Sequence, residues 1–178
     1  MFTPPIRMLL VLVTLAYGAY LLSIGNRSGF LVISAGGLFV FGHFRYGPIR
    51  PAFMALQQGE VERAEQLIST IRFPHLLNSQ SRAYLNWIHG VLDSRHDDKL
   101  KSAEQHLQTA LDLGVRTSND RCVLVATLAA VAIRQNDRDG AKEKLAAARE
   151  IPHREGAARY IDQLQRELSS NDEATRGH

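Results

Sequence analysis

CVLVATLAAVAI, the stretch from Cys122 to Ile133, is the most apolar part of the second half of the chain, and only Thr127 in it is polar. A helix that is apolar on every side is usually buried on every side. The run holds 12 residues, whereas a helix needs about 20 apolar residues to cross a bilayer. We therefore predict that this stretch is the central helix of a helical domain, with Asn119 or Asp120 as its N-cap.

Apolar residues on both sides of this run recur three and four positions apart, as in helices with one buried face. No segment after residue 50 alternates convincingly with period two, so we predict no strand. Besides the central helix, the pattern predicts helices at about 51–57, 60–72, 79–94, 99–113, 138–149 and 154–168. The last of these has a narrow apolar stripe and a charged outer face, which is typical of a helix that caps a stack. Residues 169–178 are polar and are predicted to be disordered.

Two of the predicted helix–turn–helix units share one spacing. Trp87 is followed sixteen residues later by Ala103, and Val125 is followed sixteen residues later by Ala141. Apolar residues four and seven positions after each alanine continue the match: Leu107, Ala110, Leu145 and Ala148. Pro152 follows the second unit. This pattern resembles the tetratricopeptide repeat, which has a large residue first, small residues where the paired helices touch, and a proline at the end.

The resemblance covers about residues 51–152 and implies an all-α fold over 51–168: a TPR-like α-solenoid of about three helix pairs with a C-terminal capping helix. The equivalent residues Ala64, Ala103 and Ala141 are 39 and 38 positions apart, whereas the family repeats every 34 residues or so. A generic helical solenoid therefore remains the alternative.

Solenoids of this kind bind partners on a concave face, which is formed by the first helix of each pair. The resemblance places five apolar residues there: Ile88, Leu92, Ala126, Ala130 and Ile133. An apolar groove suits a protein partner that offers an amphipathic helix or an extended apolar peptide. The alternative is that these side chains are core, covered by the helix predicted at 154–168.

The first 50 residues have a different character. They contain four arginines and no Asp, Glu or Lys. Two apolar runs, Met8 to Ile24 and Phe30 to Phe44, flank a turn-like segment at 25–29. Because about 17 apolar residues are near the lower limit for a span, we predict a hairpin of two transmembrane helices, at about 8–24 and 29–46, within residues 1–47. A cleavable signal peptide and a hairpin buried in a soluble core are the alternatives.

The arginines also predict an orientation. Arg7, Arg45 and Arg50 flank the outer ends of the two runs, and only Arg27 lies in the turn. Positive residues favour the cytoplasmic side, so we expect an integral protein of the bacterial inner membrane with its helical domain in the cytoplasm.

Small residues on the two apolar runs permit close helix packing, either within the hairpin or against a partner membrane helix. The candidates are Gly18, Ser34, Gly36 and Gly37.

Nothing in the sequence points to catalysis. The net charge of +3 combines +4 before residue 51 with −1 after it, so the folded domain offers no basic patch for nucleic acid. The only cysteine, Cys122, excludes an intramolecular disulfide. His96, Asp97 and Asp98 form the only local cluster of metal-ligand types, and they lie in a predicted turn. We therefore predict no catalytic residue, no metal and no cofactor.

Together these features lead us to expect a membrane-anchored, non-catalytic adaptor or scaffold that recruits or stabilises a membrane-associated complex. The alternative is an accessory subunit of a larger membrane enzyme or secretion machine, which packs against its complex through the hairpin. A small hydrolase or metal-binding enzyme is a third reading, and no motif favours it.

Overall fold

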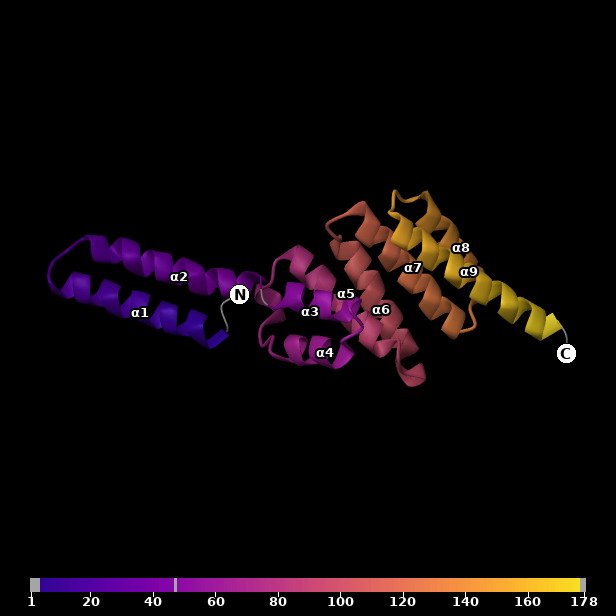
Figure 1. The fold of residues 1–178 in the computed structure, drawn as a ribbon, viewed down its shortest axis with the longest axis horizontal. Coiled ribbons are helices and arrows are strands. Elements are labelled where there is room, and N and C mark those ends of the chain that lie inside the picture. Colours follow the sequence, from indigo (N-terminus) through magenta and orange to yellow (C-terminus); the bar gives the residue numbers. More distant parts are fainter. Residues whose placement is uncertain (1–3, 47, 177–178) are drawn as a thin grey trace. The chain divides into compact units, whose positions relative to one another are not determined.

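A computed structural model describes the backbone of residues 4–46 and 48–176, and the side chains of residues 12–38 and 48–170. All regular structure in these ranges is helical, which confirms the predicted all-α class (Figure 1). The chain divides into two compact units, Met1–Gly47 and Pro48–His178.

The first unit is a helical hairpin of α1 (Pro4–Ser23) and α2 (Ser28–Tyr46). Gly25 in the connection has a φ of 76°, a conformation that glycine adopts without strain. The backbone N–H of Asn26 donates to the Leu21 carbonyl at 2.9 Å and ends α1. The Asn26 side chain then accepts from the N–H of Ser28 at 3.0 Å. The turn predicted at 25–29 thus forms through local hydrogen bonds.

Among the residues that the structure describes, no helix combines the length and the apolar character that a membrane crossing requires. The two predicted spans are therefore not supported as such. The outer ends of both, 8–11 and 39–46, have side chains outside the described residues, as do Arg7 and Arg45 of the predicted orientation.

The second unit contains all seven predicted helices. They are α3 (Ile49–Gln57), α4 (Val61–Ser69), α5 (Ser79–Asp93), α6 (Leu100–Leu113), α7 (Ser118–Arg134), α8 (Arg138–Glu150) and α9 (Glu155–Arg176). Short 3₁₀ turns at Pro74–Leu76 and Asp97–Lys99 were not predicted. Helices that follow one another pack as the pairs α3–α4, α5–α6 and α7–α8, and α9 packs on the last pair (Figure 1).

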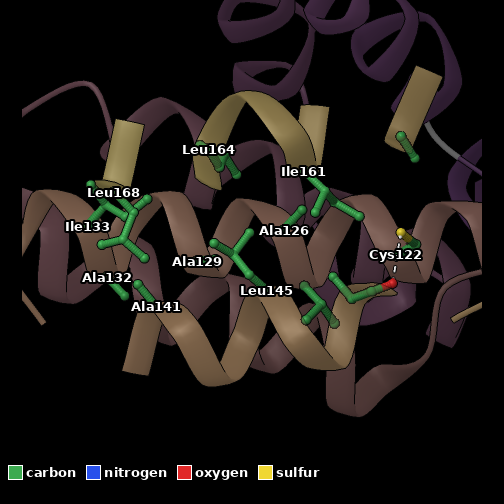
Figure 2. Packing of buried hydrophobic residues seen from close by; sticks show 13 residues of the cluster. Cys122, Ala126, Ala129, Ala132, Ile133, Ala141, Leu145, Ile161, Leu164 and Leu168 are labelled. Atoms are coloured by element: carbon green, nitrogen blue, oxygen red, sulfur yellow. Dashed lines mark hydrogen bonds between the residues drawn. The ribbon is translucent and has the colours of Figure 1, made fainter. Parts of the chain in front are cut away.

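Helix α7 is buried on two sides, which explains its nearly continuous apolar sequence. Leu124, Leu128 and Val131 pack with residues of α5 and α6. Ala126 and Ala129 point the other way and pack with residues of α8 and α9 (Figure 2). The prediction of a central buried helix is confirmed.

The start of α7 differs from the prediction. Asn119 or Asp120 was expected to cap this helix, but the capping residue is Thr117, whose hydroxyl accepts from the N–H of Asp120 at 3.0 Å. Thr117 has the extended backbone (φ −123°, ψ 154°) of an N-cap residue.

The end of α9 also differs. Residues 169–178 were expected to be disordered, but the helix continues to Arg176. The hydroxyls of Ser169 and Ser170 donate to backbone carbonyls of the preceding turn, at 2.9 Å each. No glycine or proline interrupts residues 157–176, so the sequence contains no strong helix stop before Gly177.

Candidate interaction surfaces

The predicted groove residues of α7 lie beneath α9. Ala126 is fully buried and Ile133 is 9% exposed, and both belong to the cluster that contains Ile161, Leu164 and Leu168 of α9 (Figure 2). Ala130 is partly buried against the same cluster. This part of the predicted concave face is therefore occupied by the chain's own last helix.

The groove residues of α5 are also packed. Ile88 has no exposed surface and lies in a cluster with Ile49 of α3 and Ile68 of α4. Leu92 is partly buried against that cluster. All five candidate residues thus lie in or against the core, as in the alternative reading. The apolar composition of these positions could not distinguish an open groove from a filled core.

The small residues of the hairpin fall into two groups. A Cβ atom at Gly18 would lie 2.6 Å from Ile33 Cγ1, and one at Gly36 would lie 3.2 Å from Leu15 Cδ2. Both glycines therefore allow α1 and α2 to approach each other. A Cβ atom at Gly37 would meet nothing within 4 Å, and Ser34 is exposed. The predicted small-residue patch therefore divides into Gly18 and Gly36, which lie between the two helices, and Ser34 and Gly37, which do not.

Large apolar side chains cover the outside of the hairpin. The exposed fraction is 75% for Leu31, 70% for Leu38 and 66% for Phe30 on α2. Leu12, Val13, Tyr17 and Tyr20 of α1 are also exposed. Contiguous apolar surface of this kind marks a membrane or protein contact in natural proteins.

A polar cluster lies across the seam between α5 and α6. The rings of His89 and His106 stack with centroids 5.4 Å apart. His106 hydrogen-bonds Asn86 Oδ1 at 3.1 Å, and Ser102 donates to Asp93 at 2.7 Å. Burial and then the neighbouring His106 lower the pKa of His89, against the opposing effect of Asp93. Four of these side chains are thus hydrogen-bonded in pairs, and His89 contributes its ring stacking.

No group of three or more His, Cys, Asp or Glu side chains in the described part of the chain is arranged to hold a metal ion. The cluster singled out in the sequence lies at a 3₁₀ turn, where His96, Asp97 and Asp98 are exposed. Asp97 pairs instead with Arg134 of α7.

An open depression of about 420 Å³ lies at the start of α7. It is lined by Thr117, Ser118, Asn119, Asp120, Pro152, His153 and Arg154. Asn119 Oδ1 accepts from the N–H of Arg154 at 2.9 Å, and Asp120 accepts from the Tyr84 hydroxyl at 2.6 Å. Three polar side chains of this lining, those of Thr117, Asn119 and Asp120, are thus already hydrogen-bonded within the fold.

The exposure of two apolar side chains in the second unit was also not predicted from the sequence. Phe73, directly before Pro74, and Leu76, two residues after it, are each 48% exposed. Phe73 directly follows the helix predicted at 60–72. The sequence signal for an exposed apolar loop was an aromatic residue and a leucine close to a proline.

Comparison of the chain with protein-family models, with curated proteins and with solved structures finds no match.

Proposed function

We propose that this protein is a non-catalytic adaptor, anchored in the bacterial inner membrane by its N-terminal hairpin and carrying a TPR-like solenoid in the cytoplasm. One observation carries the proposal: the hairpin packs Gly18 and Gly36 inward and exposes large apolar side chains such as Leu31 and Leu38. In water this arrangement is unfavourable, whereas in lipid it is expected because helices there associate through small residues.

The length of the apolar runs supports the same proposal. In sequence, 8–24 and 29–46 extend beyond the part of each helix whose side chains are described. Arg27 in the turn is exposed, and it is the only charged residue between Arg7 and Arg45.

Packing inside α5–α6 supports the tetratricopeptide reading. Ala103, Leu107 and Ala110 on α6 have no exposed surface. A Cβ atom on Gly90 of α5 would lie 2.6 Å from Leu107 Cγ and 3.1 Å from the carbonyl oxygen of Ala103. Small residues therefore stand where the paired helices touch, as the repeat requires.

Fractionation and co-isolation test the proposal. The full chain, expressed at native level, is expected to stay with membranes after carbonate extraction and to retain a protein partner in mild detergent. A reporter that is active only in the cytoplasm, fused after His178, is expected to be active. A reporter that is active only outside the cytoplasm is expected to be inactive. A carbonate-soluble chain would refute the anchor, and a membrane-bound chain that retains no partner would refute the adaptor role.

The second candidate is an accessory subunit that packs into a larger membrane complex through the outer side of α2. The outward position of Gly37 favours it, because small residues allow a partner helix to approach. Gly37→Leu should then release the complex and leave insertion intact. Gly36→Leu, the matched control, should disturb the hairpin itself by clashing with Leu15. If the complex survives Gly37→Leu, this candidate loses its basis.

A further inference from the structure

The connection between α4 and α5 exposes two large apolar side chains. Phe73 and Leu76 are each 48% exposed, and within residues 48–170 only Met54 joins them as an exposed large apolar residue. The remaining large apolar side chains of this part of the chain are at least partly buried. The fold of the second unit therefore leaves about half of each of these two side chains exposed.

The loop around them is ordered by its own hydrogen bonds. The N–H of Leu76 donates to the Phe73 carbonyl at 3.1 Å, and the N–H of Leu77 donates to the Pro74 carbonyl at 3.2 Å. Leu77 is 4% exposed and anchors the loop in the core. Asn78 then caps α5 by accepting from the N–H of Ser81 at 2.7 Å. A fixed turn thus holds Phe73 and Leu76 outward.

The charge along the stretch of sequence that contains the loop has one sign. Between Glu65 and Asp93 the sequence contains no acidic residue, but it contains Arg72 and Arg82. Arg72 precedes Phe73, and His75 lies 5.9 Å from the Phe73 ring, edge-on. An aromatic residue and a leucine beside basic residues form a combination that binds anionic lipid, since the apolar groups enter the interface while the charges meet the headgroups.

We propose that the loop Arg72–Leu76 docks on an anionic lipid surface, with Phe73 and Leu76 inserted at the headgroup boundary. The inference rests on the proposed function, because the hairpin supplies the bilayer. Only Gly47 and Pro48 separate the end of α2 from the start of α3. A bilayer that holds the hairpin is therefore available to the loop at high effective concentration.

Spin labels on the full chain test the docking. In a Cys122→Ala background, Phe73→Cys and Leu76→Cys each carry a nitroxide, and Gln105→Cys on the exposed side of α6 is the matched control. The chain is reconstituted in vesicles of phosphatidylglycerol with phosphatidylcholine, and in vesicles of phosphatidylcholine alone. In the anionic vesicles we expect a severalfold higher ratio of oxygen to nickel-chelate accessibility at 73 and 76 than at 105. Arg72→Gln or high salt should reduce the difference.

The outcomes separate the two proposals. A chain that does not float with the vesicles overturns the anchor and the docking together. A chain that floats, but whose labels at 73 and 76 match the control at 105, overturns the docking alone. Labels that are shielded only when a co-purified protein is present also overturn it, because the loop would then be a protein contact.

Discussion

Gly90→Ala is the substitution that best measures how tightly α5 and α6 pack. The new Cβ atom would lie 2.6 and 2.8 Å from Leu107 Cγ and Cδ2 and 3.1 Å from the carbonyl oxygen of Ala103. Leu107 and Ala103 are completely buried, so neither can move into open space. Overpacking of a core costs about 1–3 kcal/mol, and replacing a helical glycine by alanine returns about 0.5–1 kcal/mol. The difference is a net loss of about 0–2.5 kcal/mol in the free energy of unfolding, centred near 1–1.5 kcal/mol.

Fluorescence of Trp87 is the assay. It is the only tryptophan in the chain, it is 4% exposed, and it packs 4.8 Å from the Phe53 ring, so it reports unfolding of the second unit alone. The melting temperature should fall by about 3–8 °C. Gly156→Ala is the matched control, because its Cβ atom would meet nothing within 4 Å, and it should leave stability unchanged or raise it slightly. If Gly90→Ala stabilises the protein as Gly156→Ala does, the reasoning is refuted.

Three further predictions concern single side chains. Tyr84→Phe removes the 2.6 Å hydrogen bond to Asp120 and should cost about 1–2 kcal/mol in the same unfolding experiment. In the wild type, burial raises the pKa of Tyr84 to about 12, with a smaller contribution from that hydrogen bond. The ionisation of Tyr84 should therefore be absent from a spectrophotometric titration at pH 10–11. Burial lowers the pKa of His89, so the unfolded chain binds more protons near its ordinary pKa; stability should fall as the pH drops below about 6.5, and His89→Gln should weaken that dependence. Burial also raises the pKa of the Cys122 thiol, so Ellman's reagent should react only as fast as the protein opens, and rapid reaction in native buffer would contradict the buried position.

The helices of the second unit were predictable because their signals are local. The spacing of apolar residues places all seven, and most observed ends agree to within one or two residues. The long apolar run was enough to identify α7 as central, since a helix without a polar face needs neighbours on several sides. Predictions of this kind need only the spacing at which apolar residues recur and the expected length of a buried helix.

Features that depend on distant contacts were not predictable. Ala126 and Ile133 are apolar whether a groove is open or filled, and only the position of α9 decides between the two. The cap of α7 was missed for a related reason: Thr117, Asn119 and Asp120 are all capping types, and the last two hydrogen-bond Arg154 and Tyr84 instead. Exposure of Phe73 likewise follows from how the loop sits on the core.

The filled groove changes where a partner would bind. A peptide that took the predicted site on α7 would have to displace α9 and expose Ile161, Leu164 and Leu168, which are at most 5% exposed. At about 1.5–3 kcal/mol for each buried side chain, that displacement costs about 5–9 kcal/mol. A complex of micromolar affinity has only about 8 kcal/mol of binding free energy in total. Contacts with the outer face of the hairpin, or with Phe73 and Leu76, require no such displacement, because those side chains are already exposed. Binding through these surfaces is therefore favoured over binding in the groove.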